Sequence, residues 1–235
     1  SWSYAKNLLE RKEDVIRLID ERGMLTEELK NEILAATKLV EVEDLYRPYK
    51  EKKKTRATDA IAKGLEPFAQ WLLSYPKTSV IEEASKYITE EVKDETEAIN
   101  GAKDIIAEIV SDNPEFRKIL RDKLFREGFI TTNLRRNAVD EKMVYKIYYE
   151  YSEPVRTIPP HRTLAINRGE KEKVLTVKIT ANDESFINIL KTKFIEINSS
   201  TATPYIEEAI ADGYKRLIFP SLEREIRSEL TEKAE

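Results

Sequence analysis

The chain has 235 residues, carries charged side chains at 36% of its positions and has a formal net charge of −4. This length suffices for one large or two small domains, and abundant charge of both signs is typical of amphipathic helices with solvated outer faces. Cysteine is absent, which excludes disulfides, thiolate metal sites and cysteine nucleophiles and fits a reducing, cytoplasmic location. No run of about 18 apolar residues occurs, so no membrane-spanning helix is expected.

Two amphipathic helices are predicted at the start of the chain. Apolar residues recur at helical spacing over residues 2–19, and Gly23 ends this helix. Thr26 is a suitable N-cap for the second helix, whose first turn contains Glu27 and Glu28. Helices joined in this way occur in ordinary helical hairpins and in helix-turn-helix motifs that read DNA. The acidic start of the second helix favours the hairpin, because a DNA groove repels negative charge.

Residues 45–58, here called the basic segment, contain six cations and one anion, Glu51, and therefore have a local charge of +5. The cations are Arg47, Lys50, Lys52, Lys53, Lys54 and Arg56. Such a concentration of charge has to be solvated or neutralised by an anion such as phosphate. Pro48 disfavours regular helix and biases Arg47 toward an extended backbone. The segment is a candidate nucleic-acid-binding loop; the alternative is a solvated loop that forms ion pairs with acidic neighbours.

Further helices follow the basic segment. Thr58 is predicted to cap a short helix that stops at Gly64, and another is predicted between Pro67 and Pro76. Residues 82–97 carry seven carboxylates against two lysines, and we interpret them as a solvated face or, less favoured, a surface that docks the basic segment. A core helix over 99–109 and a helix from Asn113 to Gly128 complete this part.

The next part of the chain is harder to assign. Residues 129–134 are ambiguous, and the aromatic run 143–151 fits a strand by propensity but a helix by spacing. Residues 174–179 alternate with period two and predict a strand, which needs a partner from a small sheet or from another part of the protein. A long final helix is predicted to begin at Thr203, to be interrupted at Pro220, and to contain an i,i+4 pair between Glu223 and Arg227.

The sequence contains no arrangement typical of an enzyme. His161 is the only histidine, and it lacks a paired carboxylate and nucleophile. No metal-ligand cluster and no phosphate-binding glycine loop is present, so we predict no catalytic residue, no metal, no cofactor and no enzyme activity. Arg162 and Arg168 can still hold a phosphate.

These patterns predict a mainly α fold, a multi-helical elongated scaffold of helical hairpins with one short β element near residues 173–180. We treat residues 1–235 as one region, with a sub-boundary allowed near residues 137–160.

Three motifs together resemble one protein family. They read VEDLYRPYK at 42–50 with KKTRA at 53–57, YYEYSEPVRTIPPHR at 148–162, and RLIFPSLERE at 216–225. In order and spacing they resemble the bacterial Tex proteins, a family of transcription accessory proteins. The resemblance implies longer relatives with an N-terminal helical region, an RNase H-like domain, helix-hairpin-helix elements and a C-terminal RNA-binding OB-fold domain. It identifies this chain with the N-terminal helical region, as a fragment that lacks the other three parts.

The sequence and the resemblance lead to one functional hypothesis and one alternative. The hypothesis is a non-catalytic, nucleic-acid-associated scaffold that contacts backbone phosphates without reading base sequence. The residues expected to bind are the six cations of the basic segment together with Arg162 and Arg168. Either RNA or DNA is allowed, bound mainly through the domains that the fragment lacks. The alternative is a protein-interaction scaffold that docks other domains or the transcription machinery; no membrane partner is expected.

Overall fold

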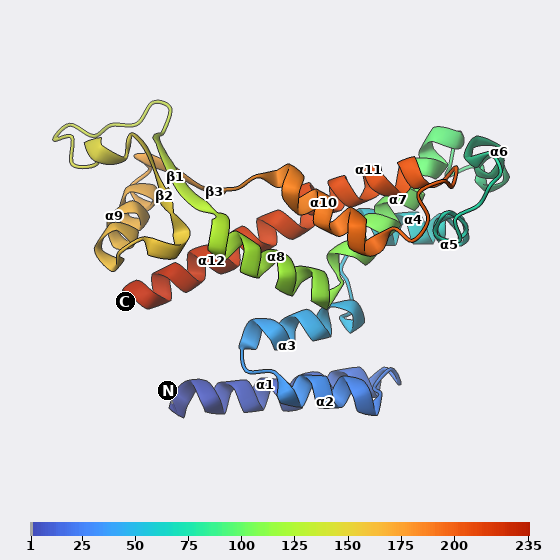
Figure 1. Cartoon of the computed structure of the whole chain (residues 1–235), viewed down its shortest axis with the longest axis horizontal. Coiled ribbons are helices and arrows are strands. Elements are labelled where there is room, and N and C mark those ends of the chain that lie inside the picture. Colours follow the sequence, from blue (N-terminus) through green and yellow to red (C-terminus); the bar gives the residue numbers. More distant parts are fainter. Residues whose placement is uncertain (1) are drawn as a thin grey trace. The chain divides into compact units, whose positions relative to one another are not determined.

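The computed structural model describes residues 2–235, which form two compact units (Figure 1). Unit 1 consists of Ser1–Lys118 and Ile187–Leu217, and unit 2 consists of Ile119–Phe186 and Ile218–Glu235. The boundaries fall inside α8 (Pro114–Glu127), inside α10 (Asp183–Phe194) and just before α12 (Phe219–Ala234). The sub-boundary allowed near residues 137–160 lies within unit 2 and stays a prediction.

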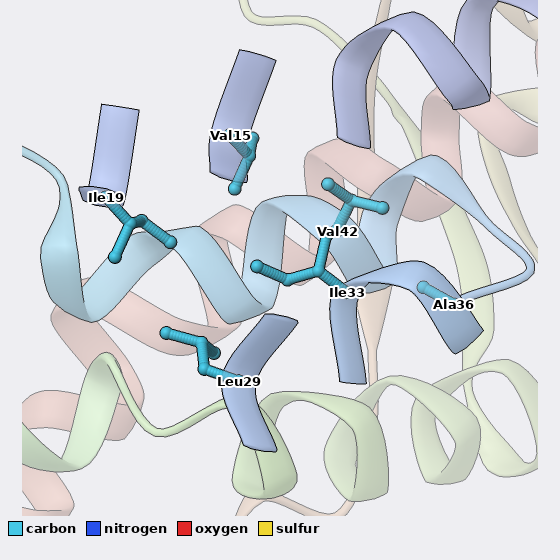
Figure 2. Packing of buried hydrophobic residues seen from close by; sticks show 6 residues of the cluster. All are labelled: Val15, Ile19, Leu29, Ile33, Ala36 and Val42. Carbon is cyan, nitrogen blue, oxygen red and sulfur yellow. The ribbon is translucent and has the colours of Figure 1, made fainter. Parts of the chain in front are cut away.

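Unit 1 begins with three helices that share a small core. They are α1 (Trp2–Glu21), α2 (Glu27–Ala35) and α3 (Leu39–Tyr46). Figure 2 shows the side chains that meet between them, which are Val15, Ile19, Leu29, Ile33, Ala36 and Val42. Gly23 has a φ of +70°, and the Thr26 hydroxyl accepts a hydrogen bond from Leu29 N at 3.1 Å, so the predicted turn and cap are confirmed. The helix-turn-helix interpretation stays a prediction.

The remainder of unit 1 is assembled around the long helix α7 (Glu95–Ser111). The elements packed against α7 are α4 (Arg56–Ala62), α5 (Glu66–Leu73), α6 (Val80–Ala84), the 3₁₀ turn Ser85–Tyr87 and α11 (Thr203–Gly213). The core helix predicted over 99–109 is confirmed at Ile99, Ala102, Ile105 and Ile106, which are buried, but not at Ile109, which is 38% exposed. The side chains of Ser79, Asp94 and Asn113 act as helix caps, since each accepts a hydrogen bond from the backbone N–H three residues further on.

Unit 2 contains an antiparallel sheet of three strands in the order β2-β1-β3. The strands are β1 (Phe129–Leu134), β2 (Glu150–Pro154) and β3 (Leu175–Thr180). The 3₁₀ turns Lys146–Tyr148 and Val155–Thr157 flank β2, and α9 (Pro160–Lys171) packs against both β3 and α12. The mainly α fold class and the predicted strand are therefore confirmed. The ambiguous stretch 129–134 forms the partner strand β1, whereas only the last two residues of the run 143–151 belong to a strand, β2.

Three local predictions are wrong. Arg47 has φ −49° and ψ −46°, because Pro48 starts a 3₁₀ turn over Arg47–Tyr49 instead of an extended segment. The cap of α4 is Thr55, three residues before Thr58. Arg227 pairs with Glu170 of α9 at 2.6 Å and not with the neighbouring carboxylate on its own helix.

The interruption predicted at Pro220 takes a specific form. The backbone turns through a π-helical segment, Tyr214–Ile218, immediately before α12. Proline has no N–H to donate and its ring crowds the carbonyl four residues earlier, so a wider turn relieves both problems. None of the described helices combines the length and the apolar character needed to span a bilayer.

Candidate nucleic-acid interface

The basic segment is fixed at both ends by local structure. Its first part closes α3 and continues into the 3₁₀ turn Arg47–Tyr49. At the other end Thr55 and Thr58 form a reciprocal capping box: each hydroxyl accepts the other residue's backbone N–H, at 3.1 and 2.7 Å. The residues between these two anchors form a short loop, and Arg56 becomes the first residue of α4.

Lys52 ties this loop to α7. Its Nζ lies 2.9 Å from Glu108 Oε1 and also contacts the Asp112 carboxylate. The Thr55 hydroxyl donates to the other oxygen of Glu108 at 3.0 Å. Burial raises the pKa of Asp112, and the nearby Lys52 ammonium opposes this shift by favouring the carboxylate. Lys52 therefore balances two carboxylates inside the chain and positions the loop.

Arg47 is the other cation of the segment that packs inward. Its side chain is half-buried, and its charge favours the ionised form of Asp112. Its Nε atom is buried and has no hydrogen-bond partner among residues 2–235. Arg47 thus adds positive charge behind the loop and not on its outer surface.

The remaining four cations of the segment face solvent. Lys50, Lys53, Lys54 and Arg56 are exposed, and none of them forms an ion pair within the described part of the chain. Three of them lie within five residues of one another, on a loop whose ends are anchored. Exposed ammonium groups held close together in this way suit contacts with successive phosphates of a nucleic-acid backbone.

The two arginines predicted to hold phosphate, Arg162 and Arg168, lie in unit 2, and they differ in their surroundings. Arg162 forms a two-pronged pair with Glu153, with Nε–Oε1 at 2.6 Å and Nη2–Oε2 at 3.1 Å. Its hydrogen bonds to this carboxylate raise the pKa of Arg162. Arg168 is exposed on α9 and has no ion pair among the described residues. His161 is also exposed, at the start of α9.

Sequence reasoning missed the carboxylates that hold Lys52. Glu108 lies on α7 and Asp112 is the C-cap of that helix, so both lie beyond the acidic stretch 82–97 that the sequence suggested as a dock. Asp104, Glu108 and Asp112 follow one another at intervals of four residues, so they line one face of the helix. Arg216 meets the first of them at 3.7 Å. The four-residue spacing of these carboxylates in the sequence could have predicted an acidic helix face that pairs with cations.

The arrangement offers electrostatic binding. Among residues 2–235, no group of three or more His, Cys, Asp or Glu side chains is placed to hold a metal ion. The elements that remain are a preformed cationic loop in unit 1 and exposed basic side chains in unit 2.

Comparison with known proteins identifies the family. Residues 75–235 match the family model described as Tex central region-like. The chain belongs to the Tex family. It is 50% identical over its whole length to the uncharacterized protein YdcI of Bacillus subtilis, and 32% identical over 99% of its length to the transcriptional accessory protein Tex of Neisseria gonorrhoeae. It is also 33% identical, over 94% of its length, to the human S1 RNA-binding domain-containing protein 1.

The Tex relatives are much longer than this chain. The chain spans 33% of the Bacillus protein, 31% of the Neisseria protein and 23% of the human protein. The family resemblance read from the three motifs is thereby confirmed. The matched description assigns residues 75–235 to the central region, and the assignment of the whole chain to an N-terminal helical region stays a prediction.

Proposed function

We propose that this chain is a non-catalytic, nucleic-acid-associated part of a Tex-family transcription accessory protein, and that its basic segment binds backbone phosphates without reading base sequence. The observation that carries the proposal is that one lysine of the segment is paired with carboxylates whereas its neighbours are unpaired and exposed. Lys52 forms ion pairs with Glu108 and Asp112, whereas Lys50, Lys53 and Lys54 are exposed on the loop that these ion pairs anchor. The names of the Neisseria and human relatives, which mention transcription and an RNA-binding domain, support the proposal.

The proposal makes binding strongly dependent on salt. Each phosphate contact releases a condensed counterion, so log K falls linearly with log salt, by about 0.9 per contact on duplex DNA and about 0.7 on single strands. Titration of labelled RNA and of labelled duplex DNA at several salt concentrations measures this slope. For the triple variant Lys50→Glu, Lys53→Glu, Lys54→Glu we expect weaker binding to all base sequences alike and a slope that is smaller by about 2–3.

A matched control separates the loop from total charge. Lys38, Lys77 and Lys93 are exposed lysines of the same unit, and none forms an ion pair within residues 2–235. Reversing all three to Glu changes the net charge by the same amount as the loop variant does. Equal loss of affinity in the two triple variants, or a salt slope unchanged by the loop variant, would contradict the proposed role of the basic segment. Nuclease turnover abolished by His161→Ala would contradict the non-catalytic assignment.

A further inference from the structure

The connection between β1 and β2 carries an unusual group of exposed side chains. This β1–β2 loop, residues 135–149, appears in Figure 1 as the yellow-green coil that leaves the sheet after β1. Four aliphatic side chains in a nine-residue stretch of this loop face solvent. Their exposed fractions are 75% for Val139, 55% for Met143, 64% for Val144 and 69% for Ile147. Scattered exposed aliphatic residues are ordinary, but a cluster of this kind marks an interaction surface.

The inner side of the loop is already filled. Tyr145 and Tyr148 are each only 5% exposed, and they point into unit 2. The Tyr145 hydroxyl hydrogen-bonds to Glu172, and the Tyr148 ring meets Tyr151 edge-on at 5.3 Å. The loop therefore has a packed face made of tyrosines and an outer face made of aliphatic side chains.

Asp140 fixes this arrangement. Its carboxylate accepts hydrogen bonds from Val144 N at 3.1 Å, from Tyr145 N at 3.0 Å and from the Tyr149 hydroxyl at 2.7 Å. Its backbone carbonyl accepts from Met143 N at 3.0 Å. A loop ordered by its own hydrogen bonds loses little conformational freedom on binding, which favours affinity.

Met143 adds a second sign that the outer face is used. Its φ is +52°, in the left-handed region that glycine and asparagine adopt at a lower energetic cost than other residues. Strained backbone of this kind persists where a side chain is needed in one place. Methionine is flexible and polarizable, and it suits contact surfaces that adapt to a partner.

The charges around the aliphatic group are positive. Arg135, Arg136, Lys142 and Lys146 are exposed and form no ion pair within the described residues. The only carboxylates in residues 135–147 are Asp140, which is engaged inside the loop, and Glu141. An apolar centre with a charged rim is the usual anatomy of a protein–protein interface, and the cationic rim selects an acidic partner. Nucleic acid fits less well, because the loop's two central aromatic rings are buried and cannot stack on bases.

We propose that the β1–β2 loop docks a partner protein whose contacting segment carries carboxylates beside aliphatic side chains. Val144 and Ile147 supply the apolar centre, and Lys142 and Lys146 supply charge at the rim. This proposal is independent of nucleic-acid binding, because it uses residues of unit 2 and none of the basic segment.

The test uses peptide selection, since the partner's sequence is not needed. A phage-displayed library of random peptides is panned against the full chain, and the enriched peptides are synthesised and titrated by fluorescence anisotropy. We expect enriched peptides to combine Asp or Glu with Leu, Ile or Val. We expect their affinity to fall about tenfold or more in Val144→Ser/Ile147→Ser and in Lys142→Glu/Lys146→Glu. Enriched peptides without carboxylates, or no peptide whose binding depends on the loop, would overturn the proposal.

Controls keep the result specific to the loop. Leu9→Ser/Ile81→Ser removes two other exposed aliphatic side chains, which are 54% and 58% exposed, and should leave peptide binding unchanged. The loop variants keep Asp140 and the backbone N–H groups that it binds, so an unchanged thermal unfolding midpoint verifies folding. The triple variant Lys50→Glu, Lys53→Glu, Lys54→Glu should bind the peptides normally, which separates this proposal from the proposed function.

The variant Val144→Ser/Ile147→Ser also tests three other candidate ligands of the loop: RNA, a lipid surface and a second copy of this chain. The variant is compared with the unmodified chain for binding to labelled RNA, for binding to phosphatidylcholine vesicles containing phosphatidylserine, and for self-association by sedimentation velocity. We expect no difference in any of the three. A loss of RNA binding, of vesicle binding or of self-association in this variant would assign the loop to that occupant and overturn the peptide-docking proposal.

Discussion

Within the basic segment, Lys52 is the cation whose removal should matter most for stability. It separates Glu108 from Asp112 and is only 25% exposed. In Lys52→Met the two carboxylates lose the ammonium group that they share, so the pKa of Asp112 should rise further above its usual range. We expect the free energy of unfolding at neutral pH to fall by about 1–3 kcal/mol.

The pH dependence of this variant has a definite sign. A carboxyl whose pKa is higher in the folded than in the unfolded chain binds its proton more tightly when folded, so stability is regained as the pH falls through the folded pKa. Denaturant unfolding of Lys52→Met between about pH 4 and pH 7 should show the deficit shrinking toward the acid end. Lys53→Met is the neighbouring control, exposed and without an ion pair in residues 2–235, and should change stability by less than about 0.5 kcal/mol. A deficit of equal size in both variants would contradict the anchoring role.

Tyr145 should control stability at alkaline pH. Burial, and then its hydrogen bond to Glu172, raise the pKa of Tyr145 to about 12. The neutral phenol is favoured in the folded chain, so its contribution is complete below about pH 10 and is lost as the pH rises toward 12. We expect Tyr145→Phe to cost about 1 kcal/mol at neutral pH and to flatten the alkaline loss of stability. Unfolding curves at rising pH measure both effects, with Tyr205→Phe as the control.

At the scale of helices, two glycines mark where neighbours approach α7 closely. A Cβ at Gly213 of α11 would lie 2.9 Å from the Ala107 carbonyl oxygen and 3.3 Å from its Cα. A Cβ at Gly101 of α7 would instead collide with the end of the Leu65 side chain. Backbone cannot move aside as a side chain can, so the two positions should respond differently to the same substitution.

We expect Gly213→Ala to lower the free energy of unfolding by about 1–3 kcal/mol, despite the gain of about 1 kcal/mol that alanine normally brings to a helix. Gly101→Ala should cost less, because Leu65 can change rotamer. Chemical denaturation of both variants gives the comparison directly. A stabilised Gly213→Ala would show that α11 does not pack against α7 at the distance described.

Elements whose apolar residues recur with a clear period were predictable from the sequence, and elements that depend on pairing with distant segments were not. The strand at 174–179 was identified because its apolar residues alternate, and β3 buries Leu175 and Ile179. The short run that became β1 fits either period, and its register, Thr131 opposite Lys178, depends on a segment more than forty residues away. The prediction of an extended backbone at Arg47 was wrong because a proline at the start of a 3₁₀ turn is compatible with helical geometry in the residue before it.

The candidate site follows the same rule. Composition alone located the cluster of cations, because charge density is a local property of the sequence. Composition could not show that Lys52 faces α7 while Lys53 and Lys54 face solvent, because that depends on where the chain folds back. The β1–β2 loop escaped prediction as well. The run 143–151 fits a strand or a helix by its pattern, and the pattern does not show that Tyr145 and Tyr148 are its only deeply buried members.

For the whole molecule, the distribution of charge matters more than its sum. The chain is net negative, so attraction of a polyanion requires places where cations locally outnumber carboxylates. The basic segment, at +5, is such a place, and the matched charge-reversal variants described above test whether it acts alone.

The course of the chain determines which fragments can fold. The chain passes between the units at residues 118/119, 186/187 and 217/218, so each unit is completed by residues from the C-terminal part of the sequence. In unit 1 α11 packs against α7, and in unit 2 α12 packs against α9 through a face that buries Leu222 and Ile226. A fragment of residues 1–186 lacks both α11 and α12, and each unit then exposes apolar surface that the full chain covers.

We therefore expect the fragment 1–186 to lose cooperative unfolding and to aggregate, and co-expression with residues 187–235 to restore a soluble pair. Thermal unfolding followed by circular dichroism, together with the dispersion of amide signals in NMR spectra, measures the first effect. A fragment ending at residue 150 tests the sub-boundary allowed near 137–160 in the same way, because it separates β1 from the β2 residues Tyr151 and Ser152 that pair with it. If either fragment unfolded cooperatively at the midpoint of the full chain, the interleaved organisation of the two units would be wrong.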